Sequence, residues 1–206
     1  MREVTLEELQ QIAENAREDV WSMARYAGRE PKLYLHWTAG HYGQFYNDYH
    51  ICIDKDGSYH LTTEDLADVL AHTEGRNSGG IGIALCCCAP PADTNDLGPE
   101  PPTSDQIDAM AKAVAALCDA LWLTINKEHV MTHGEAADNE DGYDAGEMYG
   151  PKNGCERWDL EYLGTSESPT YNPWADDGTR GGDVIRGKAI WFRQKWRAKA
   201  MDALAN

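Results

Sequence analysis

The 206-residue sequence has no long hydrophobic run and few basic residues. No segment approaches the roughly 20 consecutive apolar residues that a membrane-spanning helix needs, so we expect no membrane insertion. Its 18 lysines and arginines stand against 35 aspartates and glutamates, a formal charge of −17. This charge repels phosphate backbones, so we expect no nucleic-acid partner. The first residues lack the apolar stretch of a signal peptide, and we therefore expect synthesis in the cytoplasm.

The six cysteines do not follow the spacing of a disulfide framework or of a CxxC zinc knuckle. Three of them are contiguous, Cys86-Cys87-Cys88. We interpret Cys52, Cys86, Cys88 and Cys118 as small buried apolar residues of a protein in a reducing compartment.

Helical and strand-like segments alternate along the chain. Thr5 with Glu8, and Thr103 with Gln106, form capping boxes ahead of two amphipathic helices, and a further helix is expected over 184–196. Strand-like runs occur at 32–37, 49–54, 59–62, 81–87 and 129–132. This order predicts one α/β domain with a mixed central β-sheet flanked by helices, although an α+β arrangement stays open. Residues 134–157 lack periodicity and are expected to form a long functional surface loop.

Two histidines stand where an apolar run gives way to a glycine-containing loop. They are His36 in Leu33-Tyr34-Leu35-His36 and His133 in Val130-Met131-Thr132-His133. With Asp159 they form a candidate zinc site of three ligands, which leaves one position open, as in catalytic zinc sites. Either histidine could instead be an ordinary core residue. The rivals of Asp159 as third ligand are Cys155, Asp144 and Glu135.

The sequence resembles the zinc-dependent N-acetylmuramoyl-L-alanine amidases that are related to peptidoglycan recognition proteins and to phage amidase-type lysozymes. Four blocks in the family's order carry the resemblance: Leu35-His36-Trp37-Thr38-Ala39, Tyr49 to Gly57, His72-Thr73 through Ile83, and Thr132-His133 with Arg157-Trp158-Asp159.

The resemblance implies the fold of that family and a division of the chain into three parts. These parts are an N-terminal helix (1–28) packed on the catalytic domain, the amidase catalytic domain (29–165), and a C-terminal irregular segment with a helix (166–206), in the same domain or as a small appendage. It also implies the reaction, which is hydrolysis of the amide bond between N-acetylmuramic acid and L-alanine in peptidoglycan. Zinc would supply a water whose pKa falls to about 7.

The resemblance also implies roles for single residues. Relatives carry a basic residue two positions before the third ligand, and Arg157 before Asp159 fits this pattern. Arg157 then resembles the cation that stabilises the oxyanion. Tyr49 would orient the nucleophilic water, with strand packing as its alternative. Substrate contacts are expected from Trp37, His72 and Asn77.

The general base is not settled by the sequence. Some relatives carry a glutamate where this chain has Ala84, so the duty would fall to Tyr49, to the zinc or to Glu135. Glu135 could equally be a partner of a ligand or a helix cap.

We expect a phage or prophage endolysin that reaches the cell wall after release. A delivered antibacterial effector and an enzyme that recycles soluble muropeptides are alternatives with the same active site. From other classes, a binding-only recognition module and a structural virion protein remain. Peptidoglycan or a muropeptide is the expected partner, and the oligomeric state stays open.

Overall fold

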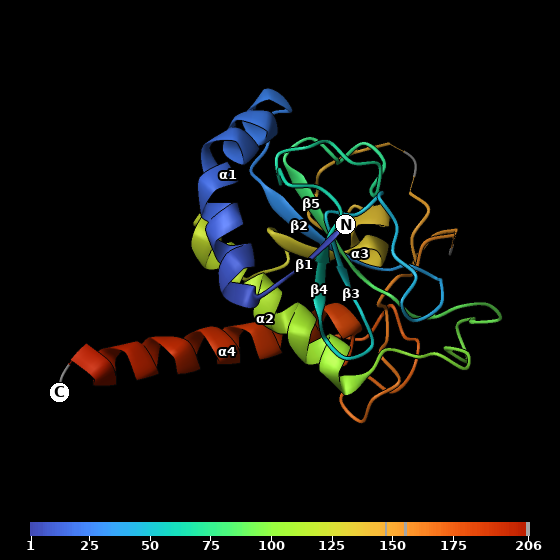
Figure 1. The fold of residues 1–206 in the computed structure, drawn as a ribbon. Helices are drawn as coiled ribbons and strands as arrows, with labels where there is room; N and C mark the ends of the chain where they lie inside the picture. The colour runs from blue at the N-terminus through green and yellow to red at the C-terminus, as the bar shows by residue number, and fades with distance from the viewer. Residues whose placement is uncertain (147, 155, 205–206) are drawn as a thin grey trace.

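A six-stranded mixed sheet forms the centre of the computed structural model, which describes residues 1–146, 148–154 and 156–204 (Figure 1). The strand order is β1-β4-β3-β5-β2-β6. The strands are β1 (Arg2–Val4), β2 (Lys32–Trp37), β3 (Ile51–Ile53), β4 (Tyr59–Leu61), β5 (Gly80–Leu85) and β6 (Val130–Thr132). The helices are α1 (Leu6–Tyr26), α2 (Ser104–Leu121), α3 (His133–Ala137) and α4 (Gly181–Leu204). The predicted α/β class with a mixed sheet flanked by helices is confirmed.

The middle of the sheet is parallel. β2 runs parallel to both β5 and β6, and β3 runs parallel to β5, whereas β1 and β4 are antiparallel. Every residue of β2 and β5 is buried, which explains why these strands appear in the sequence as continuous apolar runs. β1 was not predicted, because three residues at a sheet edge carry almost no periodic signal.

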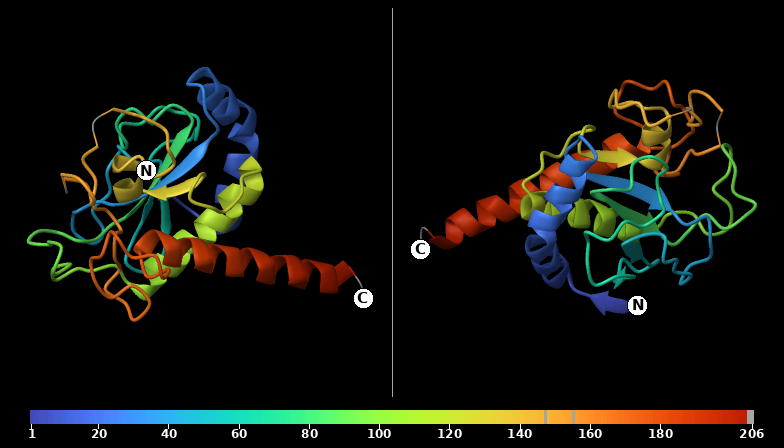
Figure 2. Two further views of the ribbon diagram at one scale, coloured as in Figure 1. Left: turned by 180° about the vertical axis from the view of Figure 1, so that it is seen from behind. Right: turned by 90° about the horizontal axis from the view of Figure 1, so that it is seen from above.

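The helices α1 and α2 pack against each other and against the sheet, as the views in Figures 1 and 2 show. Both predicted capping boxes are present, at Thr5 with Glu8 and at Thr103 with Gln106. The Gln106 side chain also donates to the carbonyls of Ile53 and Cys86, 3.0 Å from each. This amide therefore ties the start of α2 to the ends of β3 and β5.

The segment expected as one long loop, 134–157, begins as a helix. α3 occupies its first residues, and Thr132 with Glu135 forms a third capping box there. The prediction was wrong here because a five-residue helix is too short to show periodicity. Further along, Asp141 is buried between Lys32 and Arg76, and these ion pairs fix the loop to the sheet.

The C-terminal helix α4 has two different halves. Its first turns are buried and pack on α2, whereas its far end extends away from the rest of the chain (Figures 1 and 2). None of the helices in the described ranges is both long and apolar enough to cross a membrane. Cys52, Cys86, Cys88 and Cys118 are buried with free thiols, as predicted.

Candidate metal centre

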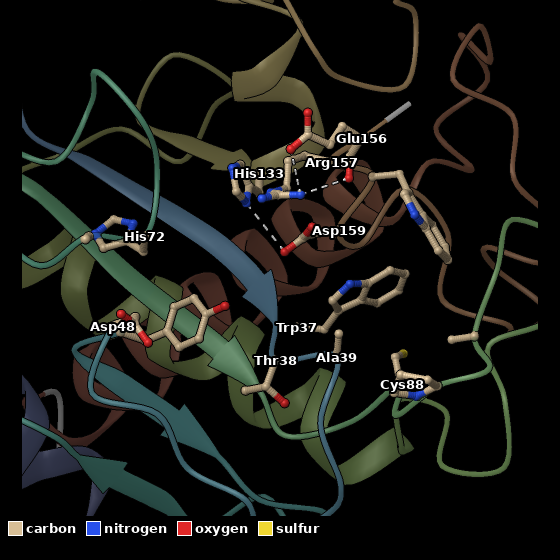
Figure 3. A pocket seen from close by; sticks show the side chains of 15 residues that line it. Trp37, Thr38, Ala39, Asp48, His72, Cys88, His133, Glu156, Arg157 and Asp159 are labelled. Carbon is tan, nitrogen blue, oxygen red and sulfur yellow. Dashed lines mark hydrogen bonds and ion pairs between the residues drawn. The ribbon is translucent and has the colours of Figure 1, made fainter. Parts of the chain in front are cut away.

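The parallel register of the sheet brings His36 and His133 together. Leu35 of β2 pairs with Thr132 of β6, so the residues that follow them lie side by side: His36 within β2, and His133 at the start of α3. The two rings lie edge to face with their centroids 4.7 Å apart. Asp159 reaches the same point, with its Oδ2 3.5 Å from Nδ1 of His36 and 3.6 Å from Nδ1 of His133 (Figure 3).

The spacing of these three donors fits a zinc ion. One ligand atom from each residue lies within 4.8 Å of the other two, and all three residues are buried. Zinc bonds of about 2.0 to 2.1 Å place neighbouring ligand atoms about 3.3 Å apart in a tetrahedron. This separation is close to the 3.5 and 3.6 Å between Oδ2 of Asp159 and the Nδ1 atoms of the two histidines. In addition, Nδ1 of His36 is a buried polar atom without a hydrogen-bond partner in the described structure. A metal ion would satisfy that atom.

The protonation states of the donors also suit a cation. Burial lowers the pKa of His36 to about 4, so its imidazole is neutral at pH 7, as a metal ligand must be. Burial raises the pKa of Asp159, but the imidazoles of His133 and His36 outweigh that effect and hold its pKa below the usual range. The site therefore presents the neutral imidazole of His36 beside an ionised carboxylate.

Of the rivals for the third ligand, Asp144 is exposed and its Oδ1 accepts the backbone N–H of Gly146. Glu135 is engaged elsewhere, as described below. Cys155 lies outside the described residues. Among the residues that the structure describes, the geometry thus favours Asp159.

A cavity of about 420 Å³ opens beside these donors (Figure 3). Trp37 and Trp158 form part of its wall and pack edge to face, with ring centroids 4.6 Å apart. A second cavity of about 380 Å³ shares His72, His133 and Arg157 with the first. Of the three donors, His133 therefore borders both hollows, and Asp159 lines the first. Trp37, from which a substrate contact is predicted, lines the first cavity.

Tyr49 lines the first cavity and lies next to a donor, with its ring centroid 5.0 Å from that of His36. Burial raises the pKa of Tyr49 far above its ordinary value, and Asp159 adds to this effect. The phenol therefore stays protonated at neutral pH. In this state it can donate a hydrogen bond, and its part as a general base stays a prediction.

Arg157 lines both cavities and is the cation nearest in sequence to Asp159. Its side chain is 46% exposed, and its Nη1 lies 3.2 Å from Oε1 of Glu156 (Figure 3). The guanidinium thus lies at the rim of the site, where it forms an ion pair with Glu156. No role for Glu156 was predicted from the sequence. Asp48 also lines the first cavity and was not predicted as a site residue. The only signal for it in the sequence is its position next to Tyr49.

Glu135 is not part of the cavity wall. Its carboxylate accepts the backbone N–H of Thr132, and Arg186 of α4 binds it through two nitrogens at 2.7 Å each. Burial raises the pKa of Glu135, but the ion pair with Arg186 outweighs it and the pKa falls to about 2. This placement contradicts the predicted role as general base, because a fully paired carboxylate of such low pKa is a weak proton acceptor. The alternative of a helix cap is the one that the structure supports.

His72 and Asn77 come to the second cavity together. The Asn77 side chain points to the backbone, where its Oδ1 accepts the N–H groups of His72 and Thr73 at 3.2 and 2.8 Å. The amide oxygen therefore organises the loop, and a contact of this side chain with substrate stays a prediction. His72 is buried against His36, with ring centroids 5.2 Å apart. His50 bonds the backbone of Asp68 and Gly82.

Comparison with known proteins identifies one family. The family model for N-acetylmuramoyl-L-alanine amidase matches residues 15–147 of the chain. The matched segment contains His36 and His133 and stops before Asp159, so the third donor comes from the geometry described above. Neither the curated proteins nor the solved structures gave a significant match.

Proposed function

Because this chain belongs to the N-acetylmuramoyl-L-alanine amidase family, we propose that it is a zinc hydrolase of peptidoglycan. It would cleave the amide bond that joins N-acetylmuramic acid to the L-alanine of the stem peptide. The family supports peptidoglycan amidase activity, and the zinc dependence is the finer part of this proposal.

One observation carries the proposal. Two imidazoles and one carboxylate converge at the mouth of a cavity, with Nδ1 of His36 buried and unpartnered in the described structure. Three protein donors leave one tetrahedral position for water or substrate, which is the arrangement of catalytic zinc. A recognition module that only binds would not need this convergence of donors.

The residues around the proposed zinc site would have different roles in the reaction. Zinc, when bound, supplies an activated water and polarises the amide carbonyl. Arg157 places a fixed positive charge at the rim, where it would stabilise the negative charge that develops on the carbonyl oxygen. The protonated hydroxyl of Tyr49 would donate a hydrogen bond to the same oxygen or to the attacking water. Trp37 and Trp158 would hold an apolar part of the substrate against the wall.

Proton transfer needs a group other than residue 135. Ala84 pairs with His36 in the register of β2 and β5, so the position where some relatives carry a glutamate has only a methyl group. Besides Asp159, the carboxylates on the wall of the first cavity are Asp48 and Glu156. We propose these two as the candidates that accept the proton of the water and return it to the leaving amine.

Mass spectrometry of digested peptidoglycan tests the proposed bond specificity. The expected products are free stem peptides that begin with L-alanine, formed by the zinc-loaded protein and not by the Asp159→Ala variant. Disaccharide fragments would identify a glycosidase and contradict the proposal. Tight binding of muropeptides without any product would instead indicate a recognition module.

We further propose that the enzyme serves as a phage or prophage endolysin. The support is the resemblance of its motif blocks to those of phage amidase-type lysozymes. Expression inside bacteria, with and without a membrane-permeabilising holin, tests this setting. Lysis that follows only when the holin is present is expected, and wall digestion that fails in permeabilised cells would contradict it.

A further inference from the structure

A threonine hydroxyl connects two histidine rings beside the metal centre. Oγ1 of Thr73 lies 3.4 Å from Nε2 of His36 and 3.0 Å from Nδ1 of His72. All three side chains are nine-tenths buried or more, with 1% of Thr73 exposed. Water therefore does not compete for these contacts, and the reaction described above makes no use of the hydroxyl.

The contacts of His36 assign its two ring nitrogens to different tasks. Nδ1 faces Asp159, whereas Nε2 faces Thr73. A neutral imidazole that ligates a metal through Nδ1 carries its proton on Nε2. That N–H would then donate to Oγ1 of Thr73.

The single hydroxyl proton of Thr73 completes the arrangement. While Oγ1 accepts from His36, its own proton is free to be donated to another acceptor. An acceptor lies within hydrogen-bond distance, which is Nδ1 of His72 at 3.0 Å. His72 in this arrangement is the tautomer with its proton on Nε2, an atom that has no hydrogen-bond partner in the described structure.

The backbone holds the hydroxyl in place before any metal binds. Asn77 accepts the N–H of Thr73 at 2.8 Å, and the carbonyl of Thr73 accepts the N–H of Arg76 at 3.0 Å. Arg76 is in turn fixed by its ion pair with Asp141. The loop therefore presents Oγ1 at a defined position instead of relying on a mobile side chain.

We propose that Thr73 is a positioning residue that presents Nδ1 of His36 to the metal, and that His72 orients the Thr73 hydroxyl for this task. The inference rests on the proposed zinc site. It gives His72 a role through Thr73 in addition to the substrate contact expected from the sequence. Partners of this kind, which orient a ligand histidine, change metal affinity by about 10- to 100-fold when they are removed.

Zinc affinity of the full-length protein, measured by competition with a chromophoric chelator, tests the proposal. Thr73→Val keeps the shape of the side chain and removes the hydroxyl, so we expect zinc to bind about 10- to 100-fold more weakly. Thr73→Ser restores a hydroxyl and should recover most of the affinity. Thr103→Val is the matched control, because it removes the hydroxyl that caps α2 and should leave zinc affinity unchanged.

Imidazole nitrogen NMR of the wild-type protein gives a readout that does not depend on a variant folding. With zinc or cadmium bound, we expect metal coordination at Nδ1 of His36, a proton on its Nε2, and a proton on Nε2 of His72. Coordination through Nε2 of His36, or a proton on Nδ1 of His72, would overturn the inference.

The outcomes separate the inference from the proposed function. A wild-type protein that binds zinc tightly, together with a folded Thr73→Val variant of equal affinity, would overturn the role of Thr73 and leave the zinc amidase standing. A wild-type protein without zinc affinity would remove the proposed function and this inference with it.

Discussion

Glu135 of α3 and Arg186 of α4 form a buried ion pair in which two guanidinium nitrogens lie 2.7 Å from the two carboxylate oxygens. Glu135 lies two residues after His133 in the same short helix, whereas Arg186 belongs to the C-terminal helix. Arg186 also donates to the carbonyl of Val130 in β6. The pair therefore connects the start of α4 to the strand and turn that present His133, a donor of the proposed metal site.

We expect Glu135→Gln to lower stability and to leave the turnover of the folded enzyme almost unchanged. Removing one partner of a buried ion pair costs about 3 to 5 kcal/mol, because the other charge stays buried. Urea unfolding measures the loss, and Glu128→Gln on the exposed surface is the control. A large fall in kcat at unchanged stability would restore Glu135 as a catalytic residue.

The same carboxylate predicts a pH dependence of stability. The pKa of Glu135 in the folded protein is depressed to about 2, below the ordinary value near 4.5. Its stabilising contribution is therefore complete above about pH 5 and is lost as the pH falls towards 2. The difference in unfolding free energy between the wild type and Glu135→Gln should shrink over that interval. A difference that stays constant from pH 6 to pH 2 would contradict the paired, ionised carboxylate.

The assignment of Asp159 as third donor predicts that Asp159→Ala loses bound zinc together with activity. Two imidazoles alone bind zinc weakly, because a site needs its full set of donors. Elemental analysis of the dialysed protein measures the metal, and about one zinc per wild-type chain is expected, because the described residues contain one such cluster of donors. Asp144→Ala is the matched control, and loss of zinc in that variant instead would move the third ligand to Asp144.

Arg157→Ala should act mainly on kcat. A positive charge that meets the developing oxyanion is worth about 10²- to 10³-fold in rate, whereas the ground-state substrate gains little from it. Steady-state kinetics on a soluble muropeptide separates kcat from KM. Arg197→Ala removes an exposed arginine that pairs with Asp119, far along α4, and serves as the control. A change confined to KM would show that Arg157 binds the substrate and does not stabilise the transition state.

Tyr49→Phe should slow the reaction by about tenfold, as expected when a single hydrogen bond of roughly 1 kcal/mol or more is lost. Because burial holds the pKa of Tyr49 far above its ordinary value, the hydroxyl does not ionise between pH 7 and pH 10. The pH profiles of the wild type and the variant should therefore have the same shape. An alkaline limb that vanishes in Tyr49→Phe would mean that the phenol titrates during catalysis.

Local sequence patterns determined the main elements of this protein. Two capping boxes marked the starts of α1 and α2, and the apolar runs that became β2 and β6 were visible because parallel strands buried on both faces admit few polar residues. His36 and His133 stood out because each ends such a run. The order of the motif blocks then indicated the family, which the family model confirms.

Only the tertiary structure decided which side chains face the metal centre and which hold the chain in place. The role of Glu135 depends on its ion pair with Arg186, which is 51 residues away in the sequence. The role of Asn77 depends on the direction of its side chain, which turns to the backbone N–H groups of His72 and Thr73. Residue spacing in the sequence reveals neither contact. The register of β2 with β6 brought the two histidines side by side, and folding then selected Asp159 from an acid-rich sequence. Local propensities act over a few residues, whereas the geometry of a metal site depends on how strands far apart in the chain pair with one another.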